Sequence, residues 1–248
     1  MLDFSHLISH HLADHPIASL GAFSFTKHML VMSIAALATA ATVLLASRTA
    51  GGLRVAIEGF AIFIRNDIAR PAMGDDDADA YLPFLLTLFL FIFFMNFLGL
   101  FPDSAAATGN ISVTATLAAT TFFLIHLSGM WRHGAVKHWK NMIPHGVPAA
   151  MIPLVFVIEL MGYFTKALAL CIRLFANMTA GHLVILLFLG LILLFGQSDP
   201  RAGLVVAPIS VGLALGLYAL ELLVALIQAY VFTMLTAIFV GGALHPEH

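Results

Sequence analysis

The last two long apolar stretches of this chain, residues 149–196 and 203–244, hold five acidic, basic or histidine residues, although a charge is costly there. They are Glu159, Lys166, Arg173, His182 and Glu221, and the uncharged Asn177 and Gln228 lie in the same stretches. A charged side chain at the centre of a bilayer costs on the order of 3 kcal/mol or more, so residues of this kind are expected to serve a function.

Arg173 differs from the other candidates because it does not release its proton. Arginine stays protonated even when it is buried, whereas lysine loses its proton readily. A fixed positive charge cannot carry a proton, but it attracts a carboxylate, favours the ionised form of that carboxylate and blocks protons from leaking past. His182 and Glu221 can gain and lose protons in a suitable environment. We therefore expect these two to feed protons towards a carboxylate that Arg173 holds ionised.

The first of the two apolar stretches carries most of its polar residues on one face. Glu159, Lys166 and Arg173 follow one another at intervals of seven residues, which on a helix places them within about 40° of each other. Asn177 extends this stripe by one turn. His182 lies nine residues after Arg173 and points nearly the opposite way on an ideal helix. We therefore expect Arg173 to face a partner and His182 to face a separate aqueous pocket.

The second apolar stretch carries Glu221 and Gln228, again seven residues apart. If the two stretches fold back on each other, pairing Arg173 with Gln228 centres the turn near residue 201, and so does pairing His182 with Glu221. The polar segment 197–201 lies at that point. No acidic residue of this chain falls opposite Arg173 in this register, so its carboxylate partner is expected on another chain.

Composition shows what must hold these residues in place. The chain has 248 residues, of which 61% are hydrophobic and 10% are charged, against about 45–50% and about 25% in soluble domains. The mean hydropathy is +1.00. A soluble protein of this length cannot bury so much apolar surface, so the bilayer must solvate most of it. The single cysteine, Cys171, excludes an intrachain disulfide and a cysteine-based metal cluster.

The hydropathy pattern predicts an all-α integral membrane fold with five membrane-crossing helices. The predicted crossings are residues 28–47, 81–101, 111–131, 149–196 and 203–244. The last two would form helices of ~72 Å and ~63 Å, although the hydrocarbon core is only ~30 Å thick. Each of them therefore either breaks into two helices or lies strongly tilted, and together they form a long antiparallel hairpin.

The remaining segments are predicted to lie outside the hydrocarbon core. We treat residues 1–248 as one membrane domain, in which 1–27 is an outer segment, 28–131 holds the first three spans and 149–244 is the ion-conducting hairpin. Residues 53–70 predict an amphipathic helix in the interface. Pro71 is expected to end this helix, Asp75–Asp77 and Asp79 to form an acidic loop, and 132–148 to form an interfacial connector. His6, His10, His11 and His15 show no spacing typical of a metal site, and we interpret them as solvated.

The distribution of lysine and arginine predicts the orientation, because these residues favour the cytoplasmic side. The connections after the first and third spans are the basic ones, with Arg48, Arg54, Arg65, Arg70, Arg132, Lys137 and Lys140. The opposite side has only Lys27 and Arg201. We therefore expect the N-terminus outside and the C-terminus inside. The first 16 residues contain no lysine or arginine, so they do not read as a secretory signal.

Two motifs closely resemble those of a known family. The run from Arg173 to His182, RLFANMTAGH, resembles the signature R-L-x-x-N-x-x-A-G-[HE] of subunit a of F-type ATP synthases. Glu221, six further residues and then QAYVF from Gln228 resemble the second signature of that family. Segments 99–102 and 110–114 and the terminal Glu247-His248 also look like family features, so the resemblance covers nearly the whole chain.

The resemblance implies a stator subunit without a catalytic site, which passes protons through two offset half-channels to and from carboxylates of the c-ring and so couples proton flow to ATP synthesis. Arg173 would face the c-ring with Gln228 beside it. Asn177, His182 and Glu221 would line the outer half-channel. Glu159 and Lys166 would lie near the inner half-channel, although both also fit snorkelling groups at an interface.

The same resemblance implies partners and a location. The expected partners are the c-ring, the b-type subunits of the peripheral stalk and the lipid bilayer. No cofactor, metal, nucleic acid or nucleotide is expected to bind, and the chain has no phosphate-binding GxxxxGK[ST] loop. A bacterial plasma (inner) membrane is expected, with the mitochondrial inner membrane as the alternative. Protons are favoured over sodium because no cluster of oxygen ligands accompanies Arg173.

Two other classes of membrane protein fit the composition. A secondary transporter predicts inverted repeats, and the sequence shows none. A membrane anchor that binds haem or quinone predicts paired intramembrane histidines as ligands. The only deep candidates are His182 and His126, which lie in different segments.

Overall fold

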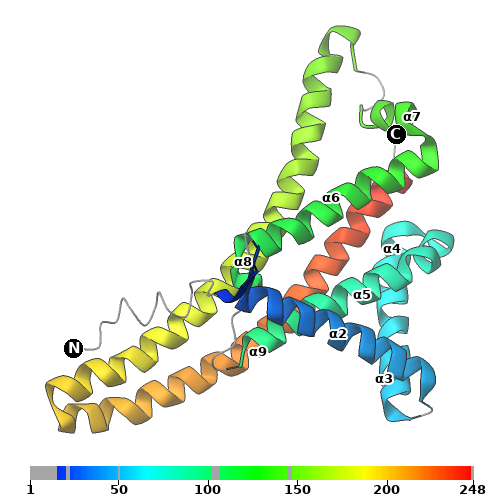
Figure 1. The fold of residues 1–248 in the computed structure, drawn as a ribbon. Coiled ribbons are helices and arrows are strands. Elements are labelled where there is room, and N and C mark those ends of the chain that lie inside the picture. The colour runs from blue at the N-terminus through cyan, green and yellow to red at the C-terminus, as the bar shows by residue number, and fades with distance from the viewer. Residues whose placement is uncertain (1–15, 21–22, 50, 102–106, 144–146, 247–248) are drawn as a thin grey trace. The chain divides into compact units, whose positions relative to one another are not determined.

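The computed structural model describes residues 16–20, 23–49, 51–101, 107–143 and 147–246. Within them, five helices are long and apolar enough to cross a membrane, which confirms the predicted all-α membrane fold (Figure 1). They are α2 (Lys27–Arg48), α5 (Asp75–Gly99), α6 (Ile111–His133), α8 (Ile152–Ser198) and α9 (Pro200–Leu244). The four N-terminal histidines, Pro102 and Glu247-His248 lie outside the described residues.

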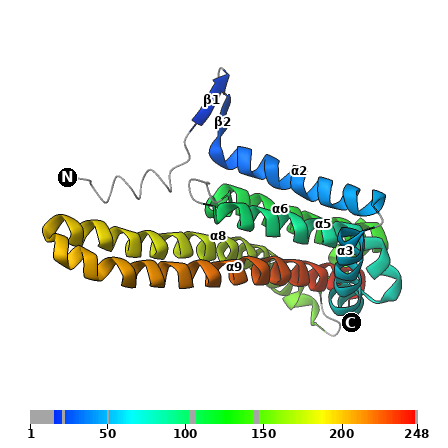
Figure 2. The same ribbon diagram turned by 90° about the horizontal axis from the view of Figure 1, so that it is seen from below.

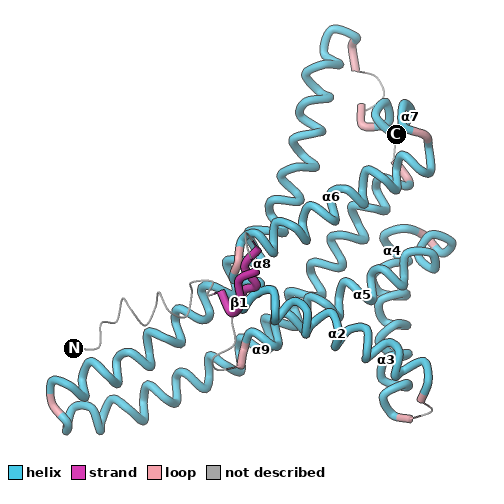
Figure 3. Tube along the Cα trace, in the orientation of Figure 1, coloured by secondary structure: helices cyan, strands magenta, loops and turns pink. Residues whose placement is uncertain are grey.

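Shorter elements connect these helices. They are the α-helices α3 (Gly52–Phe63), α4 (Arg70–Met73) and α7 (Ala135–Asn141), the π-helix η1 (Ile64–Ala69), and the 3-10 helices η2 (Ala107–Gly109) and η3 (Ala149–Met151). The strands β1 (Pro16–Leu20) and β2 (Phe23–Thr26) pair antiparallel, with Leu20 opposite Phe23 (Figure 3). These strands were not predicted, although segment 23–26 alternates apolar and polar residues as a strand does.

The prediction of an acidic loop at Asp75–Asp77 and Asp79 is wrong, because these residues begin α5. The first three occupy its first turn, where negative side chains are stabilised by the exposed N–H groups at the start of a helix. Asp79 forms two hydrogen bonds with Arg65. These bonds raise the pKa of Arg65. The second span therefore starts six residues earlier than predicted.

The prediction that Pro71 ends the interfacial helix is also wrong, because helical structure continues to Met73. The π-helix η1 lies directly before the proline, and there the Arg70 N–H bonds to the carbonyl of Arg65. Pro71 consequently falls in the first turn of α4, where a missing N–H donor is tolerated. The actual end is Gly74, whose φ of 81° suits glycine.

Helices α8 and α9 are continuous over 47 and 45 residues, so the alternative in which each breaks into two is excluded. At ~1.5 Å per residue each is ~70 Å long, more than twice the ~30 Å hydrocarbon core, which leaves the tilted arrangement. Only Asp199 separates them, and its side chain accepts a hydrogen bond from the Arg201 N–H at 3.0 Å, as an N-cap does. Figures 1 and 2 show the two helices side by side near this turn.

The described chain groups into two compact units, each built from three segments. Unit 1 contains residues up to Ala38, Ile92–Ile111 and Arg173–Gln228, whereas unit 2 contains Thr39–Phe91, Ser112–Ile172 and residues from Ala229 onward. Five of the seven candidate residues therefore belong to unit 1, while Glu159 and Lys166 belong to unit 2. The single membrane domain over 1–248 stays a prediction.

Candidate functional site

The predicted register brings His182 and Glu221 together within unit 1. The Nδ1 atom of His182 lies 2.9 Å from Oε1 of Glu221. The same Nδ1 lies 3.1 Å from the carbonyl of Met178, and Nε2 lies 2.9 Å from the carbonyl of Gly99. Because a carbonyl only accepts, both ring nitrogens can donate at once only when the ring carries two protons. The site is therefore shaped for an imidazolium beside a carboxylate.

Glu221 is the most deeply buried acidic group of this site, with 5% of its surface exposed. Within the described residues, neither of its carboxyl oxygens has a hydrogen-bond donor in line. The 2.9 Å approach of His182 is thus a charge contact, and the same Nδ1 also lies within hydrogen-bond distance of the Met178 carbonyl.

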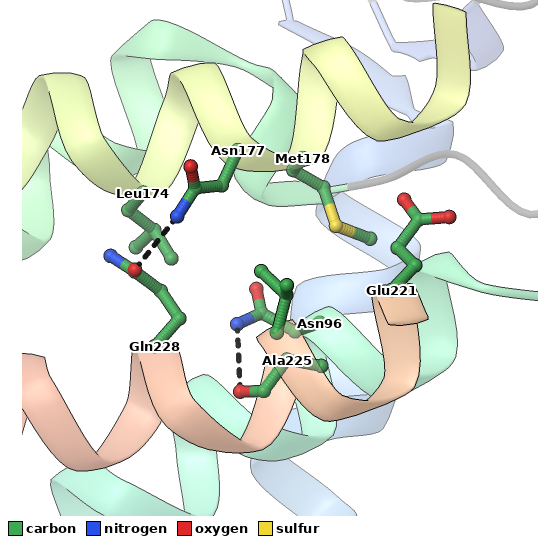
Figure 4. A pocket seen from close by; sticks show the side chains of 8 residues that line it. Asn96, Leu174, Asn177, Met178, Glu221, Ala225 and Gln228 are labelled. Carbon is green, nitrogen blue, oxygen red and sulfur yellow. Dashed lines mark hydrogen bonds between the residues drawn. The ribbon is translucent and has the colours of Figure 1, made fainter. Parts of the chain in front are cut away.

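Asn177 and Gln228 form the second contact between the two helices. The Asn177 side-chain amide donates to Oε1 of Gln228 at 3.0 Å (Figure 4). The sequence placed Arg173 opposite Gln228, whereas the bond is made by the residue one turn further along α8. The Nε2 of Gln228 is buried and, in the described part of the chain, has no acceptor.

Arg173 is exposed, although its neighbour Leu174 is only 1% exposed. Among the described residues no ion pair or hydrogen bond holds its guanidinium. Arg173 is thus an exposed arginine in an apolar helix, without a carboxylate partner among the described residues, and its partner on another chain stays a prediction.

A small cavity of about 10 Å³ lies between these two contacts, about the space that one water molecule needs. Glu221, Gln228, Asn177 and Asn96 supply its polar lining. Figure 4 shows Glu221 and Gln228 on α9 at the two ends of this region and Asn177 on α8. The cavity links the buried carboxyl group to the side of the site that carries the two amides.

Asn96 belongs to this site and was not predicted. It is 2% exposed on α5, accepts a hydrogen bond from the Thr108 hydroxyl at 2.8 Å, and directs its amide to the carbonyl of Ala225 at 3.5 Å. The signal was present in the sequence, because Asn96 is a polar residue within a phenylalanine-rich apolar segment.

Gly181 is a second residue of this site that the sequence analysis did not predict. A Cβ atom at this position would lie 2.6 Å from Oε1 of Glu221. A side chain at this position would displace the Glu221 carboxyl group, so the glycine directly before His182 makes room for it.

The two remaining candidates belong to unit 2 and are described separately. Lys166 is exposed, and its Nζ atom lies 4.7 Å from the ring centre of Tyr163 and 5.2 Å from that of Phe239, as in cation–π contacts. Glu159 is half-buried. Within the described residues, no ion pair joins either one to another side chain, and no group of three or more potential ligands is placed to hold a metal ion.

Comparison with known proteins gives consistent matches over most of the chain. Residues 26–241 match the family described as ATP synthase A chain. The chain is similar to ATP synthase subunit a of Myxococcus xanthus (strain DK1622), with 41% identity over 239 residues that cover 91% of this chain and 76% of the relative. It is also similar to ATP synthase subunit a of Chloroherpeton thalassium, with 41% identity, covering 94% of this chain and 71% of the relative.

A third relative is much longer than this chain. It is ATP synthase subunit a of Anaeromyxobacter dehalogenans (strain 2CP-1), with 43% identity over 226 residues. These residues cover 88% of this chain, but the chain spans only 57% of the length of that relative.

Proposed function

The chain belongs to the ATP synthase A chain family, and from this premise we propose that it conducts protons between the two sides of the membrane and a rotating ring of c-type subunits. In this proposal, two offset aqueous half-channels bring protons to carboxylates of the ring and take them away. The flow turns the ring, and the rotation drives ATP synthesis elsewhere in the complex. The chain contributes no nucleotide site.

One observation carries this proposal: the buried contact of His182 with Glu221 is joined by a cavity to the Asn177–Gln228 pair. His182 and Glu221 are groups that exchange protons. A water-sized cavity beside them supports transfer from the carboxyl group towards the amides. The outer half-channel would therefore run past His182 and Glu221 and end at Asn177 and Gln228.

Arg173 has the electrostatic task in this scheme. Its exposed side chain belongs to the turn of α8 directly before Asn177, so that it can meet a carboxylate of the ring at the end of the outer path. Its permanent charge favours the ionised form of that carboxylate, which must lose its proton before it can pass. The same charge repels protons that would cross directly between the half-channels.

The rest of the proposal concerns partners and location. The apolar helices make the chain an integral membrane protein, and its relatives are bacterial, so we place it in the bacterial plasma membrane. The c-ring and the b-type peripheral stalk are its proposed partners. Because the chain belongs to this family, we do not retain the two alternative functions, a secondary transporter and a membrane anchor that binds haem or quinone.

Substituting Arg173→Ala in membranes that carry the assembled complex tests the proposal. We expect ATP-driven proton pumping, measured by quenching of a pH-sensitive dye, to fall to background because the ring carboxylate loses its cation. Arg201→Ala is the matched control, since it removes an exposed arginine from the turn of the same hairpin, and it should pump normally. Pumping that survives Arg173→Ala would refute the proposal.

A further inference from the structure

Unit 2 contains a pair of buried histidines that the outer path does not use. His126 on α6 and His138 on α7 are 5% and 4% exposed. The Nδ1 of His126 lies 3.1 Å from the Nε2 of His138. A contact of this length between two imidazoles requires one nitrogen to donate and the other to accept, so the two rings share one proton.

Aromatic rings enclose the pair. The ring centre of His126 lies 5.3 Å from that of Trp139, 4.5 Å from that of Phe122 and 5.5 Å from that of Tyr163 on α8. On the other side, a Cβ atom at Gly129 would lie 2.2 Å from the Nδ1 of His138. The pair is therefore packed between these aromatic rings and the backbone at Gly129.

Each ring has a second nitrogen outside this shared bond. The Nε2 of His126 is buried and has no hydrogen-bond partner in the described part of the chain. A buried nitrogen of this kind is costly unless it exchanges protons or water with its surroundings. On His138 the second nitrogen is Nδ1. His138 lies on α7, the short helix that also carries Lys137 and Lys140.

The charged and titratable neighbours come from each helix around the pair. Tyr163 and the cation of Lys166 come from α8, as does Glu159 one turn before Tyr163. From the end of α6 comes His133, which donates from Nε2 to the Leu244 carbonyl of α9 at 2.9 Å. Burial, and secondarily the charge of His133, lowers the pKa of His138. Both effects favour the neutral form of His138.

We propose that His126 and His138 form a two-imidazole proton relay in the inner half-channel, on the side that the lysines of α7 assign to the cytoplasm. A proton binds to Nε2 of His126, the proton on Nδ1 passes to Nε2 of His138, and the proton on Nδ1 of His138 leaves. One proton enters and one leaves, and each ring ends in its other tautomer until the rings reset. This inference rests on the proposed function and gives it protonatable groups on the inner side.

The test compares His126→Gln and His138→Gln with His133→Gln in membranes that carry the full complex. Glutamine keeps hydrogen-bonding groups but does not titrate. Passive proton flux through the membrane sector is measured against the pH of the cytoplasmic side, after the ATP-synthesising part is detached. Both pair variants should lower the flux about tenfold or more, as expected for loss of a general acid–base group, and should flatten its dependence on cytoplasmic pH. His133→Gln loses a contact to a carbonyl and a charge near His138, but it leaves both rings of the pair in place, so it should keep the flux and its dependence on cytoplasmic pH.

Unchanged flux and an unchanged pH profile in both pair variants would overturn the relay. If a variant fails to assemble, ¹⁵N-histidine NMR of the unsubstituted complex decides instead. The relay requires that each of the two rings is found with its proton on either nitrogen, and two rings that stay in a single tautomer at every pH would exclude it. If both pair variants conduct normally and Arg173→Ala is inactive, the relay alone is refuted. If Arg173→Ala is active, the proposed function itself is refuted.

Discussion

At the scale of single residues, Glu221 has the position that it needs because a neighbouring residue lacks a side chain. Gly181 faces the carboxyl group so closely that a Cβ atom there would lie 2.6 Å from Oε1 and 2.9 Å from the carboxyl carbon. Glu221 is itself buried, so it can yield only by moving its whole side chain. Its distance from His182 depends on this glycine.

We predict that Gly181→Ala lowers ATP-driven proton pumping several-fold without preventing assembly. The added methyl group displaces the Glu221 carboxyl group from His182, and overpacking of this kind costs roughly 1–3 kcal/mol. The measurement is dye quenching in membrane vesicles, normalised to the amount of assembled subunit. Gly162→Ala is the control on the same helix, because a Cβ there meets nothing within 4 Å. Equal pumping by the two variants would show that the close approach has no part in proton transfer.

The residue scale also shows how far the sequence could predict the site. Antiparallel pairing about a turn near residue 201 predicted that His182 meets Glu221, and the two lie 2.9 Å apart. The same pairing placed Gln228 opposite Arg173, but Gln228 bonds to Asn177 instead. Antiparallel register determines the level at which residues meet, whereas the rotation of each helix about its axis depends on packing against other helices. Asn96 was missed because it comes from such a third helix.

At the scale of elements, the errors of the sequence analysis lie at helix ends. Hydropathy identifies apolar spans, but it does not report that aspartates stabilise the first turn of a helix, and so the start of α5 at Asp75 was placed too late. A proline likewise predicts a helix end, but the π-helix before Pro71 changes the hydrogen-bond register and admits it. Composition alone revealed neither the stabilising aspartates in the first turn of α5 nor the π-helix that accommodates Pro71.

The end of α9 has a close contact with the π- and α-helical segment before α5. A Cβ atom on Gly241 would lie 1.9 Å from the backbone carbonyl oxygen of Ala72. Nearby, His245 and Arg132 lie 2.8 Å and 3.5 Å from the carboxyl oxygens of Asp77. A backbone carbonyl cannot rotate away as a flexible side chain can, so the two elements must separate if Gly241 is enlarged.

We therefore predict opposite results for two adjacent glycines. Gly241→Ala should destabilise the protein by roughly 1–3 kcal/mol through overpacking, whereas Gly242→Ala should be neutral or slightly stabilising, since a Cβ on Gly242 meets nothing within 4 Å and alanine is the better helix former. The measurement is thermal unfolding of the purified protein in detergent, together with its yield in membranes. A Gly241→Ala variant as stable as Gly242→Ala would mean that this contact does not hold α9.

At the scale of the whole molecule, the number of spans and the long hairpin were predictable because both follow from the length of apolar segments. The choice between broken and continuous helices was not, since apolar residues suit either, and only the structure shows 47 and 45 uninterrupted helical residues. The orientation in the membrane rests on the positions of lysine and arginine alone. It decides which half-channel is the outer one, so it supports both the proposed path and the histidine relay.

Cysteine labelling tests this orientation, and the chain is well suited to it because Cys171 is the only cysteine. In a Cys171→Ser background, Lys137→Cys and Arg201→Cys each place one thiol at an exposed position in the connections at opposite ends of α8. A membrane-impermeant maleimide should label residue 137 only in inverted vesicles, with the cytoplasmic face outside, and residue 201 only in right-side-out vesicles. The positive-inside rule gives this expectation. The reverse pattern would exchange the two half-channels and would place the His126–His138 pair on the outer side, so that the relay would have to deliver protons from outside rather than release them into the cytoplasm.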